Sequence, residues 1–400
     1  MNNFFSYTGS FKNPSRVAYK LKKKIKIFIL LFLIILIPNL AFAEIKNFNT
    51  KPDNINTIIR NEIKEPFSYS GLAAFYNGVS TYIVSDDEIE KLNDELFYSI
   101  KQKQSLAIIG HYKILIIKDI NGALLIKNHK IIWQEGEASK QEFNKKNFRA
   151  QLLSKSDLTH LAQPYQKLKY VHLWEPFRLL SIGIESILLW INSLHLFGWG
   201  VTIILSSLVF TVFILPINIL LIRSQRKMFY VQASLAPELE DIKFNFSGEE
   251  AHNRFMAVHK ARGVSPFYNL RPLIYTLVPI PFLIAIFNVL GELDLILGHS
   301  FLWIQDLAYP DGIFHFKTYI PLIGNSINPL PILMILLTIF AALLHKNKII
   351  SVKNLRKQKL KLYFIAVGIF LIFYPFPSGM VLFWTFATIW QLIQQKIISI

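Results

Sequence analysis

Polar side chains lie inside the apolar segments of this chain, at spacings that place them on helix faces. Ser207 and Thr211 are four residues apart in the segment that begins at Trp199, Asn218 follows them, and Thr388 lies in the last apolar segment. In a membrane, such groups bond a neighbouring helix or line a wet cavity. The alternative is that each hydroxyl bonds a carbonyl of its own helix. Polar faces on several segments together favour a shared hydrophilic cavity.

The sequence offers no constellation for covalent or metal chemistry. It has no cysteine, which excludes thiol nucleophiles and thiolate metal sites. His111, His129, His160 and His172 are scattered without metal-ligand spacing, and no Walker motif is present. We therefore expect a protein that is not an enzyme and needs no cofactor.

The positions of the basic residues predict that the apolar segments cross a membrane. Nearly all Lys and Arg after Trp199 lie in every second loop: 222–271 carries eight and 345–361 carries seven, whereas 292–327 carries only Lys317. Cytoplasmic loops concentrate Lys and Arg, which fixes the expected orientation. The pattern also accounts for most of the net charge of +17. The lipid bilayer is therefore the expected partner, and no specific nucleic acid is required.

Residues 1–43 have the layout of a secretory signal. A basic stretch precedes the apolar core Ile27–Ile37, and Ala41-Phe42-Ala43 matches a small-x-small cleavage site. The core is shorter than the ~20 residues of a membrane-spanning helix. However, 27–43 as a whole could serve as an uncleaved anchor, and either alternative exports the residues that follow.

Residues 44–172 predict a small exported α+β domain. Acidic residues at the start of 86–103 and lysines near its end indicate a helix there. The segments 112–119 and 123–134 are rich in β-forming residues, and Asn121-Gly122 between them indicates a hairpin.

Residues 173–198 predict an amphipathic helix. Arg178, Glu185 and Asn192 recur on one side, and apolar residues fill the rest. Because a charge at bilayer depth costs ~2.5 kcal/mol or more, Glu185 argues against a span and favours a helix in the outer interface. The alternative is a buried helix of the exported domain.

Residues 199–398 form the predicted membrane core, a polytopic α-helical bundle. Its five spans are expected at about 199–221, 272–291, 328–344, 361–375 and 379–397. The loop 222–271 predicts a cytoplasmic hairpin of two helices, Arg223–Leu235 and Glu249–Ala261. This hairpin is either a solvated connector or a docking arm for incoming chains or the ribosome.

Several motifs follow one another in order between residues 173 and 398. They are Trp199-Gly200, Pro216, Gly263-Val264-Ser265-Pro266, FLWIQDL at 301–307 and FPSGMVLFW at 376–384. In order and spacing they resemble the YidC-type membrane protein insertases, the bacterial branch of the Oxa/Alb family. FLWIQDL and FPSGMVLFW are specific together. The family's five spans, outer interfacial helix and cytoplasmic hairpin match the elements expected above.

The resemblance implies an insertase and chaperone of the bacterial inner membrane, with its C-terminus in the cytoplasm and residues 44–198 on the outer side. Family members hold a hydrophilic groove that takes a polar client segment, while apolar client segments enter the lipid. Because burying polar groups in hydrocarbon costs several kcal/mol each, a wet groove lowers the barrier. The implied partners are newly made membrane proteins, and the ribosome or a protein translocase.

The sequence departs from the family pattern in the groove. Members usually carry a positive residue, typically arginine, five residues before the proline of the first span, and Thr211 takes that position here. The two aromatics after Phe-Pro-Ser-Gly, usually tyrosines, are Phe383 and Trp384. Arg271 is a candidate substitute charge. By resemblance, the groove residues are Ser207, Thr211, Asn218, Phe383, Trp384 and Thr388.

Two further departures indicate a divergent or specialised member. The exported domain is shorter than the large β-sandwich of Gram-negative members, and the sequence stops at Ile400 without a basic tail. Three functions remain open: an insertase with a narrow client set, a non-inserting assembly or scaffold subunit of a membrane complex, and a transporter or pore. The absent arginine favours the second, and the lack of an internal repeat disfavours the third. A neutral groove should prefer uncharged or basic clients.

Overall fold

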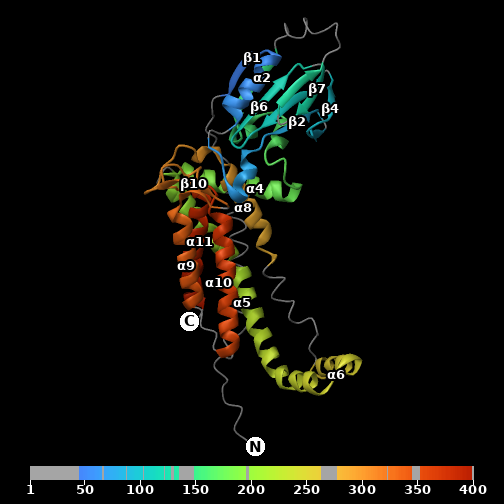
Figure 1. Cartoon of the computed structure of the whole chain (residues 1–400), viewed down its shortest axis with the longest axis vertical. Coiled ribbons are helices and arrows are strands. Elements are labelled where there is room, and N and C mark those ends of the chain that lie inside the picture. Colours follow the sequence, from blue (N-terminus) through green and yellow to red (C-terminus); the bar gives the residue numbers. More distant parts are fainter. Residues whose placement is uncertain are drawn as a thin grey trace, which may run out of the picture.

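A β-rich domain lies at one end of the chain's fold and a group of long helices at the other, with α4 (Glu175–Ser193) between them (Figure 1). The computed structural model describes residues 45–64, 67–86, 88–101, 103–120, 122–127, 130–134, 148–194, 198–262, 277–321, 323–344 and 352–398. The predicted signal or anchor at 1–43, with its cleavage point after Ala43, lies outside the described residues, as does His129.

The larger sheet of the β-rich domain has six strands in the order β1-β9-β6-β5-β2-β3, and every pair is antiparallel. The strands are β1 (Lys46–Thr50), β2 (Ser80–Val84), β3 (Ile89–Lys91), β5 (Ser105–Ile109), β6 (Lys113–Lys118) and β9 (Phe148–Ser154). Its central strands are buried on both faces. In β6, Leu115 and Ile117 enter one core while Ile114 and Ile116 enter the other, as the period of two in a strand requires.

Each face of this sheet has its own cover. On one face lie α2 (Pro52–Ile58), η1 (Ile59–Ile63) and a three-stranded sheet; on the other lie η3 (Ser156–His160) and η4 (Tyr165–Leu168). The small sheet has the order β4-β7-β8. Its strands are β4 (Phe97–Ile100), β7 (Gly122–Lys127) and β8 (Lys130–Gln134).

Two predictions for this domain are wrong. Residues 86–103 contain β3 and β4 rather than a helix, because these strands pair with β2 and β7 and bury Leu92 and Ile100 in the core. The segments 112–119 and 123–134 do form strands, but not with each other. Strand β6 pairs with β5 and β9, whereas β7 pairs with β4 and β8. The predicted hairpin between them therefore does not form.

Helix α5 (Trp199–Asn245) is much longer than the predicted first span. It continues through Pro216 and Pro237, so the prediction of a separate helix over Arg223–Leu235 is wrong. A proline removes one helix hydrogen bond and bends the helix without necessarily ending it. Figure 1 shows α5 curving away from the other helices in its second half. The helix ends at Asn245, and the next helix begins at Gly248, whose φ of 63° suits glycine.

The remaining helices overlap the expected segments where the structure describes them, but α10 begins nine residues before its predicted span, within the loop expected at 345–361. They are α6 (Gly248–Ala261), α8 (Ile280–Glu292), α9 (Pro329–Leu344), α10 (Val352–Phe373) and α11 (Ser378–Ile398). Among the described residues, one helical stretch is long and apolar enough to cross a membrane: Trp199–Leu221, with a mean hydropathy of 2.5. Shorter apolar stretches occupy Ile280–Glu292, Pro329–Ala341 and Tyr363–Phe373.

The segment between α8 and α9 carries η6 (Asp294–Ile296) and an antiparallel hairpin, β10 (Phe314–Ile320) with β11 (Gly324–Ile327). It lies where α4, α9 and α11 approach the β-rich domain (Figure 1). We call this end of the helices the domain end. The helical core there is continuous with η2 (Gly71–Asn77) of the β-rich domain, because Ala73 and Tyr76 share its apolar cluster.

Candidate functional site between α5 and α11

Helices α5 and α11 meet through polar side chains at two levels. The indole N–H of Trp390 donates to Ser207 Oγ at 3.1 Å, and Asn218 Nδ2 donates to Gln394 Oε1 at 3.4 Å. Ser207 and Asn218 are eleven residues apart, which is three helical turns, and Trp390 and Gln394 are four apart. Each helix therefore presents one polar face to the other. Trp390 is not among the groove residues predicted from the sequence, because a tryptophan in an apolar segment gives no polar signal.

The hydroxyl groups in this region donate to their own helices. Ser207 Oγ donates to the carbonyl of Ile204 at 2.7 Å, Thr211 Oγ1 to Ser207 at 2.8 Å and Thr388 Oγ1 to Trp384 at 2.9 Å. This arrangement is the alternative stated for Ser and Thr in apolar helices. Thr211 is buried and adds no charge. The stretch from Trp199 to Ile222 also contains no charged residue, so the contact is polar and neutral.

Phe383 and Trp384 follow one another but contact different helices. The ring of Phe383 lies 5.9 Å from that of Phe210 on α5, while Trp384 makes an edge-on contact at 5.4 Å with Phe373 on α10. Phe383 is buried. The two rings also contact each other edge-on, with their centroids 6.1 Å apart.

A cavity of about 420 Å³ lies beside the α5–α11 contact, and it is apolar. Its walls come from α4, α5, α8 and Phe383 of α11. The one hydroxyl in its lining, Ser206 Oγ, already donates to the carbonyl of Thr202 at 2.7 Å. This cavity suits hydrocarbon rather than a polar segment. The predicted hydrophilic groove stays a prediction, since Arg271 and the rest of 263–276 lie outside the described residues.

The sequence motifs meet at the domain end of the helices. The ring of Phe301 packs directly over Gly200, leaving no room there for a Cβ atom. At the start of α11, the backbone N–H groups of Ser378 and Gly379 donate to the carbonyls of Tyr309 and Leu307 at 2.9 and 2.8 Å. The FLWIQDL segment therefore joins the first turns of α5 and α11. The motif residues therefore have a structural role, in holding the first turns of α5 and α11 together, although they are far apart in the sequence.

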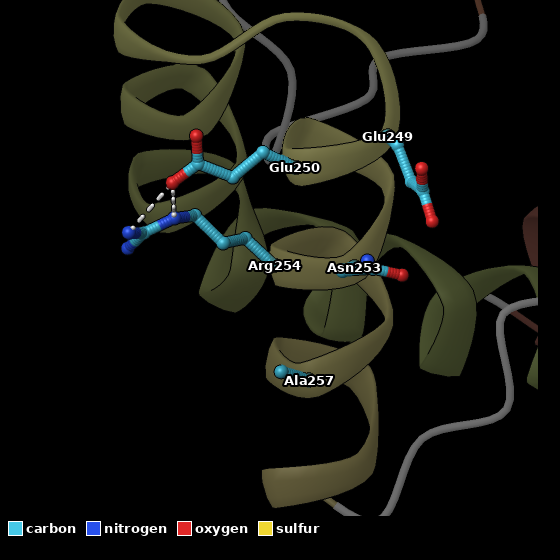
Figure 2. Close-up of a pocket in the computed structure, with 5 residues that line it drawn as sticks. All are labelled: Glu249, Glu250, Asn253, Arg254 and Ala257. Atoms are coloured by element: carbon cyan, nitrogen blue, oxygen red, sulfur yellow. Dashed lines mark hydrogen bonds and ion pairs between the residues drawn. The ribbon is translucent and has the colours of Figure 1, made fainter.

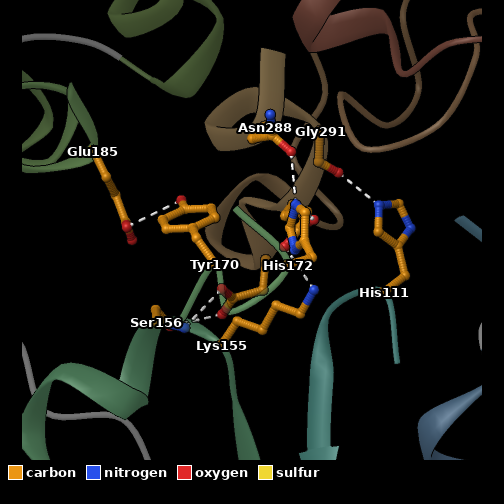
Figure 3. Close-up of polar contacts among 10 residues, drawn as sticks. His111, Lys155, Ser156, Tyr170, His172, Glu185, Asn288 and Gly291 are labelled. Carbon is orange, nitrogen blue, oxygen red and sulfur yellow. Dashed lines mark hydrogen bonds and ion pairs between the residues drawn. The ribbon is translucent and has the colours of Figure 1, made fainter. Parts of the chain in front are cut away.

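Polar contacts join the β-rich domain to α4 and α8 (Figure 3). Lys169 Nζ lies 2.7 Å from Glu185 Oε1, and Tyr170 donates to the other oxygen of the same carboxylate at 3.1 Å. Ser156 donates to Asp294 through its N–H and its hydroxyl, at 3.1 and 2.7 Å. Glu185 therefore belongs to a buried ion pair, and its side chain does not face solvent or lipid.

The same junction includes Lys155, whose Nζ lies 2.7 Å from Glu292 Oε2, and His172, whose Nε2 is 2.8 Å from Asn288 Oδ1. His111 Nε2 is 2.6 Å from the carbonyl of Gly291, so this nitrogen carries the proton and donates (Figure 3). We call these contacts, with Lys169–Glu185 and Ser156–Asp294, the polar junction.

Burial shifts the pKa of three groups in the polar junction. It raises the pKa of Glu185, against the opposing effect of Lys169, and it raises the pKa of Asp294. Burial lowers the pKa of His111 to about 3, helped by the charge of Lys155. His111 is therefore neutral near pH 7, and it is stacked between the rings of Tyr76 and Tyr112.

Helix α6 presents a solvated charged face at the far end of α5 (Figure 2). Glu250 Oε1 accepts hydrogen bonds from Arg254 Nε and Nη2 at 3.1 and 2.9 Å, beside Glu249 and Asn253. Exposed pairs of this kind contribute little to stability. Within the described ranges, no group of three His, Asp or Glu side chains could hold a metal ion.

The comparisons with known proteins match the helical part of the chain. A family model described as "60Kd inner membrane protein" matches residues 190–400. A membrane protein insertase YidC of Chlamydia muridarum is 33% identical over 232 residues, covering 55% of this chain and 27% of that protein. The YidC insertase of Treponema denticola is 29% identical over 207 residues, covering 50% and 34%.

A third relative, the membrane protein insertase YidC of Chlorobaculum tepidum, is 25% identical over 208 residues, covering 52% of this chain and 33% of that protein. The chain thus spans about a quarter to a third of the length of these curated relatives. The family match covers more than half of the 400 residues. The chain therefore belongs to the 60Kd inner membrane protein family, the family of the YidC insertases.

Proposed function

We propose that this protein is a membrane insertase that passes hydrophilic client segments along the α5–α11 contact and releases apolar segments into the lipid. The observation that carries the proposal is the neutral polar face of α5, where Ser207 and Asn218 bond Trp390 and Gln394 of α11. Side chains that bond one another in the closed contact can exchange these partners for a client's polar groups. This lowers the cost of bringing such groups into hydrocarbon.

The proposed arrangement has five spans in the inner membrane, at about 199–221, 272–291, 328–344, 361–375 and 379–397. The β-rich domain and α4 lie on the outer side, and the α5–α6 hairpin and the C-terminus lie in the cytoplasm. Three observations support it: the alternation of basic loops, the apolar stretch Trp199–Leu221 and the family match. The exposed charged face of α6 is the proposed contact with the ribosome or a translocase.

The lack of charge in the α5–α11 contact bears on which client proteins it would accept. A cation at the position of Thr211 would attract acidic client segments, whereas the buried threonine here does not. We propose that the clients are a narrow set of membrane proteins whose translocated segments are uncharged or basic. Crosslinks spread over many acidic segments would contradict this preference.

Complementation tests the insertase activity. The native chain, Thr211→Arg and Thr338→Arg are each expressed in a bacterium depleted of its own insertase, with their membrane levels matched. Thr338→Arg is the matched control, because Thr338 on α9 also bonds its own helix but lies outside the α5–α11 contact. Rescue by the native chain is the expected result. Rescue by Thr211→Arg alone would mean that the scaffold is intact and the activity has been lost or redirected.

A second candidate is an assembly subunit that does not insert clients. Thr211 in place of the usual arginine, and the polar junction that holds the β-rich domain against α4 and α8, favour it. A rigidly held outer domain would offer a fixed contact surface to a membrane complex. Stable co-purification with one complex, without crosslinks to nascent chains, would favour this function over the first.

A further inference from the structure

Apolar side chains are exposed along the β10–β11 hairpin at the domain end of the helices. Phe314 is 64% exposed and Phe316 is 39% exposed. His315 and Lys317, which alternate with them along β10, are exposed as well. The pairing with β11 is regular at Phe314 and His315 and shifts in register before Ile320, so β10 is exposed on both sides, and its two phenylalanines form an apolar surface with no cover within the described residues.

The apolar surface extends onto the segment before the hairpin. Leu302, Trp303 and Ile313 are also exposed there. Trp303 is nevertheless held in place, because its indole N–H donates to Asp311 Oδ2 at 3.1 Å. The same carboxylate oxygen accepts the N–H of Leu330 in the first turn of α9, at 2.7 Å. Asp311 thus attaches Trp303 to the first turn of α9.

The hairpin is also fixed on its other strand. The hydroxyl of Tyr374, at the end of α10, donates to the carbonyl of Ser326 in β11 at 2.9 Å. Asn328 donates to the carbonyl of Tyr374 at 2.7 Å. These hydrogen bonds fix the position of the hairpin relative to the ends of α9 and α10, beside which it lies (Figure 1).

Charge indicates what covers the apolar surface. Lys317 is the one basic residue of 292–327, a segment with four acidic residues, and it lies on β10 beside the two phenylalanines. Exposed aromatics beside a lysine match the boundary between acyl chains and phosphate groups. The acidic residues Glu292, Asp294 and Asp311 do not offset the charge of Lys317 at this surface, because their carboxylates are held in internal contacts.

We propose that the β10–β11 hairpin lies in the outer interface of the bilayer, with Phe314 and Phe316 facing the acyl chains and Lys317 at the lipid phosphates. This inference rests on the proposed spanning of α9 and α10. It gives the hairpin a function in setting the depth of these helices, because Asp311 and Tyr374 transmit its position to them.

The absence of cysteine from the chain allows a direct test. Single cysteines at positions 314, 316, 315 and 317 of the full chain carry a nitroxide in vesicles of phosphatidylcholine and phosphatidylglycerol. The collision rates of each label with oxygen and with a water-soluble nickel chelate are compared. A label at Leu336, exposed in the middle of α9, is the reference for the hydrocarbon.

The expected result is a preference for oxygen at 314 and 316, as at 336, and a preference for the nickel chelate at 315 and 317. A preference for nickel at all four hairpin positions, with oxygen preferred at 336, would overturn the hairpin proposal alone. A label at 336 that prefers nickel would instead contradict the spanning of α9. Protection of 314 and 316 from both reagents would mean that protein covers them, and would also overturn the proposal.

Discussion

Lys169 and Glu185 form an ion pair of 2.7 Å in which each side chain is only 4% exposed. Lys169 belongs to the β-rich domain and Glu185 to α4, so the pair joins the β-rich domain to the helices. A buried charge without its partner is strongly unfavourable, and Tyr170 supplies the further hydrogen bond that the carboxylate needs. The ion pair therefore fixes the position of α4 relative to the β-rich domain.

Breaking this pair should destabilise the full chain. We expect Lys169→Met to lower the free energy of unfolding by about 3–5 kcal/mol, because it leaves the Glu185 carboxylate buried and unpaired. Lys169→Met combined with Glu185→Gln should recover part of the loss. Urea titration of the full chain in detergent measures both changes. The control, Arg149→Met, breaks an exposed pair with Asp119 and should cause no measurable change. Equal effects of the two single variants would contradict a structural role for the buried pair.

His111 should make stability depend on pH. Its pKa of about 3 in the folded protein lies below the ordinary value of 6.5, so the unfolded chain binds more protons between these values and stability falls as pH decreases from 6.5 toward 3. The full effect is of the order of 5 kcal/mol. His111→Phe, which keeps an aromatic ring between Tyr76 and Tyr112, should abolish this dependence.

The raised pKa values of Glu185 and Asp294 act in the opposite direction, because the folded protein then binds more protons than the unfolded chain. The His111→Phe variant, which lacks the effect of the histidine, should therefore become more stable as pH falls. This gain is expected at pH values between the raised pKa values of Glu185 and Asp294 and the ordinary pKa values of these side chains. Unfolding measured across pH tests the reversal, with exposed His252→Phe as the control. If the free energy of unfolding of His111→Phe depends on pH as it does in the native chain, another group causes the loss of stability at low pH.

Gly200 should not tolerate a side chain. A Cβ atom there would lie 2.1–2.7 Å from atoms of Phe301, so Gly200→Ala should destabilise the protein by about 1–3 kcal/mol. Adding Phe301→Ala should relieve the clash. Gly368→Ala on α10 is the matched control: nothing lies within 4 Å of its Cβ position, and it should stabilise its helix by about 0.4–1 kcal/mol. Thermal unfolding of the variants in detergent distinguishes these outcomes.

The α5–α11 contact should respond unequally to the loss of its two partners. Trp390→Phe leaves Ser207 still donating to Ile204 and should cost about 0.5–1.5 kcal/mol. Ser207→Ala leaves the Trp390 indole N–H without its acceptor and should cost more, about 1–3 kcal/mol. The yield of crosslinking between cysteines on α5 and α11 measures how well the contact is kept in each variant. Equal losses of yield in the two variants would contradict the hydrogen bond between Trp390 and Ser207 as the cause of the difference.

Local patterns in the sequence predicted the ends of some helices and not of others. The apolar runs predict α9 and α11 within a residue or two, whereas α5 and α10 extend well beyond their predicted spans. The charge pattern and motifs led to the family that the comparisons confirm. These properties are determined by the sequence alone because they depend on residues that are adjacent along the chain or on composition of whole loops.

The tertiary structure decided which distant residues meet. Strand β6 pairs with β9 across more than thirty residues, and this pairing overrides the local hairpin signal before β7. Gly200 meets Phe301, and Glu185 meets Lys169, although the sequence left open whether the helix of Glu185 lies in the outer interface or is buried against the exported domain. Hydroxyl groups in the spans could bond either their own helix or a cavity, and only the packing of α5 on α11 distinguishes the two. Partner choice depends on the free energy of the whole packed core, which no short segment contains.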